Sequence, residues 1–410
     1  MPGQTLPEGE ELEYDASAYS MYHAMKPEWP CLTFDIIKDN LGSNRTRFPH
    51  TVYCVAGTQA DQKDKNKLQL MKLSDMSKTY KKQDNGDSDD DEALDSDGDD
   101  SDNDNVDSDP ILEHVDIAHS GCVNRVRCMP QKPNIVATFS ETSHVHIFDL
   151  SAHIASFDNR QGTAGLSNRP IFTHSGHKTE GYAMDWSGVS AGQFLTGDCS
   201  GAIDYWLPNE GGGGWNVSSK AWKCNDSVED IQFSPTEGTV FASGDCGGNI
   251  QIFDTRQKGK SMLCSKAHDT DVNVISWNKI VTNLLASGAD DGVFSVWDLR
   301  NFKKGEPLAK FTTSSKPITS CEWHGTDESM IVVSDEDAVF VYDLSIEEDA
   351  EEAAKTASAT LVGEKKIPPQ LLFMHLGSQS NKEAHWHPQI PSMIMSTALS
   401  GFNVFIPSNL

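Results

Sequence analysis

The stretch that decides the fold runs from residue 268 to residue 300, HDTDVNVISWNKIVTNLLASGADDGVFSVWDLR. VNVISW has the alternation of a half-buried strand, and LLASGA and VFSVWDL predict two further strands. The turn at residues 290–292, Asp-Asp-Gly, joins the last two, because Asp and Gly tolerate the positive φ of a tight connection. The sequence therefore predicts a small sheet with a buried hydrogen-bonded group, made of His268, Ser287, Asp291 and Trp297.

The same pattern recurs through most of the chain. Positions equivalent to Trp297 are separated by 44 to 63 residues, and they are residues 148, 206, 253, 297, 342 and 405. Repeats of roughly 40–45 residues are typical of four-stranded units that stack into a ring. Six such repeats, and a further one in the alternating segments CLTFDII, TVYCVAGTQ and KLQLMKL, predict seven blades. We expect the N-terminal strand to complete the last blade, so that no sheet edge stays open.

His268 followed by Trp297-Asp298 resembles the WD repeat, the four-stranded unit of β-propellers. This resemblance implies an all-β fold, a seven-bladed WD-repeat β-propeller over residues 27–410. The other repeats depart from the motif, and we expect their polar networks to differ or to be absent. The residues at the position of Asp291 in three of them are Thr142, Ser200 and Gly247.

Four segments differ in composition from the blades. Residues 1–13 are polar and are predicted to be flexible, and residues 14–26 predict a helix with Asp15 as its N-cap. Residues 84–109 contain 14 acidic residues and no basic one. Such a run cannot bury apolar area and should be a disordered loop, either a solvated spacer or a tether for a basic client. Residues 345–369 predict an acidic helical insert that ends at two prolines.

Composition narrows the possible partners. The chain of 410 residues has a net charge of −28, which favours basic partners and opposes direct nucleic-acid binding. Its nine cysteines are spread widely and form no CxxC pair, so we expect free thiols in a reducing compartment. The N-terminus lacks a long apolar run, so we expect neither a signal peptide nor a membrane span.

The sequence contains no Walker loop and no HExxH motif. Two histidine pairs on predicted strands could each offer two metal ligands, but four ligands are not evident. These histidines are His144 and His146, and His385 and His387. We therefore expect a non-enzymatic protein platform without cofactor or metal.

Acidic residues gather where the innermost strands begin and in the turns beside them. A ring mouth with this lining would bind Lys or Arg of an extended peptide through charge-assisted hydrogen bonds. Tyr182, beside Glu180, could add a cation–π contact. For each single acid, a role in forming a turn is the alternative. The predicted mouth residues are Glu180, Tyr182, Asp198, Glu229, Asp230, Asp245, Asp271, Asp290 and Asp335.

Several longer stretches of the sequence resemble one subgroup of the WD-repeat proteins. YDASAYSMYHAMKPEWPCLTFDII at 14–37, HKTEGYAMDW at 177–186 and PPQLLFMH at 368–375 resemble the WD-repeat proteins that begin with a histone-binding helix domain. The acidic tract, EAHWHP at 383–388 and STALSGF at 396–402 look like the glutamate-rich WD-repeat family of ribosome-biogenesis regulators. The tract of this chain is rich in Asp rather than Glu, which keeps its charge.

The family resemblance implies an escort function. Such a protein captures a new basic ribosomal protein, the third protein of the large subunit, and delivers it to pre-ribosomal particles. The implied protein is a monomer of the nucleus and nucleolus with a cytoplasmic pool, and it contacts neither membrane nor nucleic acid directly. A histone chaperone or chromatin-complex subunit is the first alternative, and a ubiquitin-ligase substrate receptor is the second.

The resemblance also implies two binding sites. In the histone-binding relatives, a client helix lies in a groove between the N-terminal helix and the acidic insert, while a basic tail occupies the ring mouth. By matching motif, the mouth would use Glu180, Tyr182, Glu229 and Asp230. The groove would use Tyr22, Met25, Glu347, Glu348, Asp349, Glu351, Glu352, Pro368 and Leu371.

Overall fold

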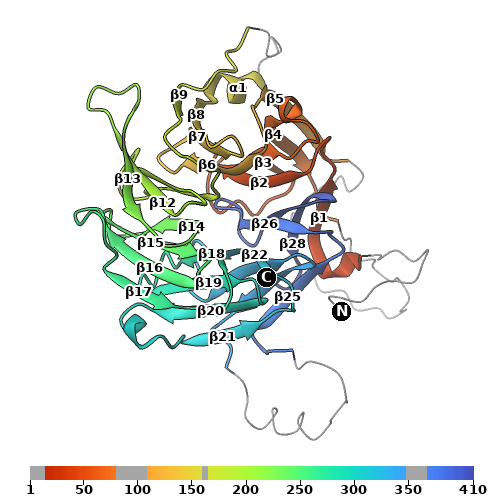
Figure 1. Ribbon diagram of the computed structural model, residues 1–410. Coiled ribbons are helices and arrows are strands. Elements are labelled where there is room, and N and C mark those ends of the chain that lie inside the picture. Colours follow the sequence, from red (N-terminus) through yellow and green to blue (C-terminus); the bar gives the residue numbers. More distant parts are fainter. Residues whose placement is uncertain (1–13, 80–108, 159–164, 348–366) are drawn as a thin grey trace, which may run out of the picture.

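The computed structural model describes residues 14–79, 109–158, 165–347 and 367–410. These residues form seven four-stranded antiparallel sheets that are arranged as blades of a ring (Figure 1). The predicted seven-bladed β-propeller is therefore confirmed. We number the blades 1 to 7 in the order of their innermost strands. The predicted flexible terminus, residues 1–13, and residues 84–108 of the predicted acidic loop lie outside the described residues.

The innermost strand of each blade faces the central channel. Each of these strands contacts the innermost strand of the next blade, and β26 contacts β2, which closes the ring. They are β2 (Cys31–Ile37), β6 (Val123–Met129), β10 (Ala183–Trp186), β14 (Val228–Phe233), β18 (Val272–Trp277), β22 (Ile318–Trp323) and β26 (Asn381–Trp386).

The second and third strands are mostly buried, because neighbouring blades pack on both faces of each sheet. The second strands are β3 (His50–Thr58), β7 (Lys132–Ser140), β11 (Phe194–Gly197), β15 (Val240–Asp245), β19 (Leu284–Ala289), β23 (Met330–Asp335) and β27 (Ile394–Ala398). The third strands are β4 (Lys67–Met76), β8 (Val145–Asp149), β12 (Ala202–Pro208), β16 (Asn249–Asp254), β20 (Val293–Asp298), β24 (Ala338–Asp343) and β28 (Gly401–Pro407).

The outer strands form the rim. In blade 1 the fourth strand follows the acidic segment in the sequence. Because that segment separates it from the other three strands, the sequence pattern did not assign it to this blade. The outer strands are β5 (Ile111–Ala118), β9 (Phe172–His174), β13 (Trp215–Lys223), β17 (Leu263–Lys266), β21 (Ala309–Thr312), β25 (Leu371–Leu376) and β1 (Tyr19–Met25).

The predicted helix over residues 14–26 is wrong. Asp15 does cap a helix, since its Oδ1 accepts the Ser17 N–H at 2.9 Å, but this is a 3-10 helix of only three residues. The chain then continues as β1, which pairs antiparallel with β28. Tyr19 and Met21 are buried while the residue between them is less so, and this period of two, together with the backbone partners on β28, outweighs the helical spacing. The expectation that the N-terminal strand completes the last blade is confirmed.

Hydrophobic clusters lie between neighbouring blades. Trp277 and Trp297 of blade 5 pack with Ile252 of blade 4, and Met21 of blade 7 packs with Phe34 of blade 1. All nine cysteines are free thiols. Within the described ranges, no helix has the length and the apolar character that crossing a membrane requires. The helical segments of the described chain are α1 (Ser151–Ser156), η1 (Ala16–Ala18), η2 (Lys63–Lys65) and η3 (Phe302–Lys304).

Candidate functional site

The polar network of blade 5 contains three of the four predicted residues. His268 Nε2 lies 2.7 Å from Ser287 Oγ, which also accepts the Trp297 indole N–H at 2.8 Å. Asp291 is exposed, and its carboxylate instead accepts the Val293 backbone N–H at 3.1 Å. Burial lowers the pKa of His268 to about 4, so the ring is neutral at physiological pH. This network therefore fixes the blade and carries no free charge.

Blade 3 has a more extensive network, although Ser200 stands at the position of Asp291. His177 Nε2 lies 2.8 Å from Thr196 Oγ1, which accepts the Trp206 indole N–H at 3.0 Å. His177 Nδ1 lies 3.0 Å from Asp198 Oδ2. Asp198, two residues before Ser200, thus supplies the carboxylate that the motif position lacks.

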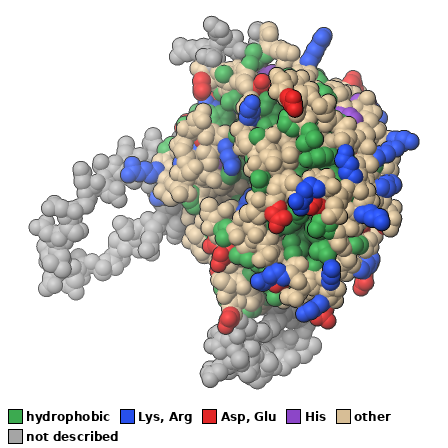
Figure 2. Space-filling model, turned by 90° about the vertical axis from the view of Figure 1, so that its left-hand side faces the viewer, with side chains coloured by type: hydrophobic (Ala, Val, Ile, Leu, Met, Phe, Trp, Pro, Cys, Tyr) green, Lys and Arg blue, Asp and Glu red, His purple; other side chains and the backbone are tan. Residues whose placement is uncertain are grey.

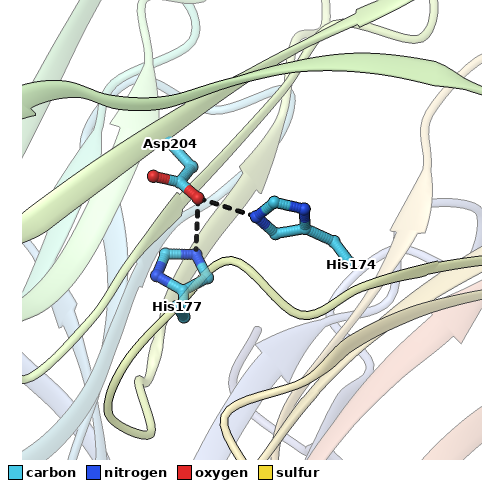
Figure 3. A group of neighbouring side chains, drawn as sticks. All are labelled: His174, His177 and Asp204. Atoms are coloured by element: carbon cyan, nitrogen blue, oxygen red, sulfur yellow. Dashed lines mark hydrogen bonds and ion pairs between the residues drawn. The ribbon is translucent and has the colours of Figure 1, made fainter.

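A second carboxylate lies on the other side of the same histidine (Figure 3). Asp204 Oδ2 lies 2.9 Å from His174 Nε2 and 3.5 Å from His177 Nε2. Among the described residues, these three side chains are the one group with metal-ligand spacing. The hydroxyl of Thr196 already occupies His177 Nε2, and the Lys220 backbone N–H binds the other oxygen of Asp204 at 2.6 Å. Hydrogen bonding within the blade therefore accounts for the arrangement without an ion.

Three of the predicted mouth acids form turns instead of lining the mouth. Asp198, Asp245 and Asp335 are each at most 1% exposed. Their Oδ1 atoms accept backbone N–H groups of the following turn, from Ala202 at 3.0 Å, from Asn249 at 2.9 Å, and from Asp337 and Ala338 at 2.9 Å. Burial opposes ionisation of Asp198, yet the hydrogen bonds from His177 and Ser200 prevail and lower its pKa to about 2. For these three residues, the alternative of a turn-forming Asp is the correct one.

Four of the other predicted mouth acids are accessible. Glu180, Glu229 and Asp271 are partly exposed and stand at the start of the innermost strands of blades 3, 4 and 5. Glu180 Oε2 accepts one N–H of Asn124 at 2.9 Å, and Glu229 Oε1 accepts the Cys246 thiol at 3.0 Å. Asp290 is exposed and accepts an N–H of Asn273 at 2.8 Å. Each carboxylate therefore keeps lone pairs free for a ligand.

Tyr182 lies among these acids. Burial, followed by the charge of Glu180, raises the pKa of Tyr182 to about 12, so the phenol stays neutral. The charge of Glu229 also acts on it. We call Glu180, Tyr182, Glu229, Asp271 and Asp290 the acidic mouth.

The negative charge of the mouth is local. Figure 2 views the side of the molecule on which β13, β16 and β17 lie, and Lys and Arg side chains are spread over it. Exposed lysines of blades 3 to 5 include Lys220, Lys223, Lys258, Lys260, Lys266, Lys303, Lys304 and Lys310. The structure therefore places acidic residues at the mouth and basic residues along this part of the rim.

Asp230 is placed differently from the mouth acids. Its side chain is 9% exposed and accepts the backbone N–H groups of Ile231 and of Ile275, both at 2.9 Å. The second of these bonds ties blade 4 to blade 5. The structure therefore does not place Asp230 in the mouth, because its carboxylate lies inside the channel, where it lines the cavity and joins two blades.

A polar belt inside the channel escaped prediction from the sequence. One residue of each innermost strand belongs to it, and five of the seven accept a backbone N–H of the next blade, such as Asp35 from Cys128 at 2.6 Å and Glu322 from Trp386 at 3.1 Å. The sequence signal was a polar residue directly before a large apolar one, as in Glu322-Trp323. The channel belt consists of Asp35, Arg127, Asp185, Gln232, Ser276, Glu322 and His385.

Comparison with known proteins places the chain in a family. A family model for "Histone-binding protein RBBP4", which also covers the related component of the CAF1 complex, matches residues 9–77. "Ribosome assembly protein rrb1" of Schizosaccharomyces pombe is 42% identical over 99% of this chain and 83% of its own length. "Glutamate-rich WD repeat-containing protein 1" of Dictyostelium discoideum is 47% identical over 98% and 83%. "Protein HEAT STRESS TOLERANT DWD 1" of Arabidopsis thaliana is 44% identical over 100% and 91%.

The chain belongs to the glutamate-rich WD-repeat family. The resemblance seen in the sequence is thereby confirmed, including the histone-binding-type segment at the N-terminus of this family member.

The groove predicted for this family member is only partly within the described residues. Tyr22 on β1 lies against β25, with its ring 5.5 Å from that of His375, and Leu371 begins β25. Met25 packs on the other side, against the cluster shared by blades 7 and 1. Glu347 is exposed and Pro368 is partly buried, whereas Glu348, Asp349, Glu351 and Glu352 lie outside the described residues. Tyr22 packs in the cluster between blades 6 and 7, Leu371 in the cluster between blades 5 and 6, and Met25 in the cluster between blades 7 and 1, so the structure does not bring these three residues together.

Proposed function

We propose that this chain is a non-enzymatic escort in ribosome assembly. It holds a basic segment of a large-subunit ribosomal protein, the third protein of that subunit, at the acidic mouth. It works as a monomer in the nucleus and nucleolus, with a pool in the cytoplasm that meets newly made clients. The name of the fission-yeast relative, "Ribosome assembly protein", supports the process. The net charge of −28 supports a basic client.

The observation that carries the proposal is the division among the acids. Glu180, Glu229 and Asp271 remain partly exposed around one end of the channel, while neighbouring acids are used up in turns. Carboxylates with free lone pairs bind Lys and Arg strongly when the ligand desolvates them. The neutral ring of Tyr182 beside them can lie against the aliphatic stem of such a side chain.

Charge reversal tests the mouth. We expect the triple change of Glu180, Glu229 and Asp271 to Lys to weaken binding of the purified ribosomal protein on the order of 100-fold, because three ion pairs become repulsive. A control with the same change of net charge reverses Glu210, Glu237 and Glu306, which are exposed away from the mouth. Fluorescence anisotropy gives both affinities, and thermal unfolding checks that both variants fold. Equal affinities of the two variants would contradict the proposal.

A second candidate client is a histone. The match of residues 9–77 to the histone-binding family model favours it, and the same acidic mouth would receive the basic tail. Affinity purification of the tagged chain from growing cells separates the candidates. A large-subunit ribosomal protein as the most enriched stoichiometric partner supports the first proposal. Histones in that place support the second, and ubiquitin-ligase subunits would argue against both.

A further inference from the structure

A cavity of about 540 Å³ occupies the part of the channel remote from the acidic mouth. Its lining includes Pro130, Gly188, Pro235 and Pro388, which follow the ends of innermost strands. Glu180 and Glu229, in contrast, stand where such strands begin. Because the innermost strands are parallel to one another around the channel, their two ends define its two openings. The cavity therefore faces the opposite side of the ring from the mouth.

Two arginines of blade 2 separate the cavity from the mouth. Arg125 Nε donates to the Tyr182 carbonyl at 2.7 Å, and its Nη1 pairs with Glu383 of blade 7. Arg127 Nη2 lies 3.1 Å from Glu383 Oε1. Both guanidinium groups thus extend past blade 1 to reach blade 7. This ion-paired layer forms the inner end of the cavity.

The carboxylates around the cavity are compensated unequally. Glu383 has the two arginines, and Glu322 has His385 at 3.0 Å and Lys279 at 3.6 Å. Asp35 and Asp230 each accept two backbone N–H groups.

Asp185 differs from these four. It accepts a single N–H, from Phe233 at 2.7 Å, and no cationic side chain lies within ion-pair distance of it among the described residues. The remaining charged residue of the cavity lining, Lys38, is exposed to solvent.

The electrostatics of Asp185 reflect this lack of a partner. Burial, together with the charge of Asp230, raises the pKa of Asp185 to about 7, against the opposing effects of the Phe233 N–H, Arg127 and Lys279. A carboxylate that is only half ionised at neutral pH beside a cavity gains its full charge when a cation binds. A perturbed carboxyl in a pocket of this size is typical of a ligand site.

We propose that this cavity is a second binding site, which takes one organic cation, an ammonium or guanidinium group on an alkyl stem, against Asp185 and Asp230. The apolar side chains of Met184 and the prolines of the lining would contact the stem. The cation comes either from a Lys or Arg side chain of a client or from a free small amine. Since the site lies on the side opposite the acidic mouth, it can be filled while a client occupies the mouth.

Calorimetric titration of the full chain tests the site with n-butylguanidinium and n-butylammonium, and with neutral pentanamide as the control ligand. We expect both cations to bind with one-to-one stoichiometry at pH 8 and the amide not to bind. Asp185→Asn should weaken cation binding at least tenfold while the protein stays folded, because the amide oxygen can still accept the Phe233 N–H. Glu237→Gln, at an exposed site, and the triple Lys variant of the mouth should bind like the unaltered chain.

The pH dependence adds a second criterion. Lowering the pH from 8 to 6 should weaken cation binding about tenfold in the unaltered chain and leave the residual binding of Asp185→Asn nearly constant. His385, with its pKa raised to about 9, and Glu322, with its pKa lowered to about 2, do not titrate in this range. A blocked Gly-Arg-Gly peptide that binds more tightly than butylguanidinium identifies a client side chain as the source, and the reverse order identifies a free amine.

Cation binding that is unchanged in Asp185→Asn, or equal binding of pentanamide, would overturn the proposal. Either result is independent of the mouth, since the charge-reversal variant of the mouth is measured separately against the ribosomal protein. The two proposals can therefore fail or succeed one without the other.

Discussion

Two sets of acids occur near the same end of the channel, and they differ in what their oxygens contact. Asp198, Asp245 and Asp335 are buried and accept backbone N–H groups, whereas Glu180 and Glu229 are partly exposed and have few protein partners. The buried acids stand at the ends of second strands, whereas Glu180 and Glu229 stand where innermost strands begin. Within the turn after a second strand, a shift of one position also exchanges a buried residue for an exposed one.

Blade 5 shows this shift within the ring itself. Its position equivalent to Asp245 is Ala289, whose carbonyl accepts the Gly292 N–H at 3.2 Å to close the turn. Asp290, one residue later, is exposed. An acid near a strand end is therefore informative about binding only when its place in the turn is known.

Removing a turn acid should have the largest effect on stability. We expect Asp198→Ala to lower the free energy of unfolding by about 3 kcal/mol, because His177 and two backbone N–H groups lose their acceptor in a buried site. Asp271→Ala in the mouth should stay within about 0.5 kcal/mol of the unaltered chain. Urea unfolding gives both values. Similar losses in the two variants would mean that the two sets of acids do not differ in kind.

Lowering the pH should also destabilise the fold through the turn acids, by less than the substitution of Asp198 does. The pKa of Asp198 falls from its ordinary value of 3.8 to about 2 in the folded chain. Its contribution to stability is therefore present above pH 4 and is lost as the pH falls from about 4 to about 2, on the order of 2 kcal/mol in total.

Unfolding free energies measured at a series of pH values test this titration. The matched comparison is Asp198→Asn, which cannot titrate and should show a shallower decline over this window. Parallel curves for the two proteins would contradict the assignment.

The smallest expected effect concerns the aromatic member of the mouth. Tyr182→Ala should weaken binding of the basic client by about threefold to fivefold, the loss of one exposed cation–π contact. Tyr182→Phe should bind like the unaltered chain, since the neutral hydroxyl contributes no charge. Anisotropy titrations at low salt resolve differences of this size. A larger loss in the Phe variant than in the Ala variant would show that the hydroxyl, not the ring, matters.

Most of the fold could be predicted because each blade repeats a period of two between turn residues. VNVISW, LLASGA and VFSVWD became β18, β19 and β20 with nearly the expected bounds. The segment around Tyr22 was mistaken for a helix because apolar residues there satisfy both periods. Its partner strand β28 is nearly 400 residues away, and no local signal reports such a contact.

The candidate site was harder to predict than the fold. The sequence indicated acids near the channel, and Glu180 and Glu229 do lie at its mouth. It could not separate them from Asp198 and Asp245, although an Asp followed three residues later by Gly201 or Gly248 is a typical signature of a turn. The channel belt was missed because its members share no residue type. They share only their position on the innermost strands, and these positions lie together only after the seven strands have assembled around the channel.

The pairing of β1 with β28 has a consequence for biosynthesis. Tyr19 lies opposite Pro407, so β1, which precedes the strands of blades 1 to 6, receives its partner only after those blades have been synthesised. Until then the ring stays open, and both β1 and the face of blade 1 that packs against blade 7 lack their final neighbours. The ring can therefore close only after β28 has been synthesised and can pair with β1.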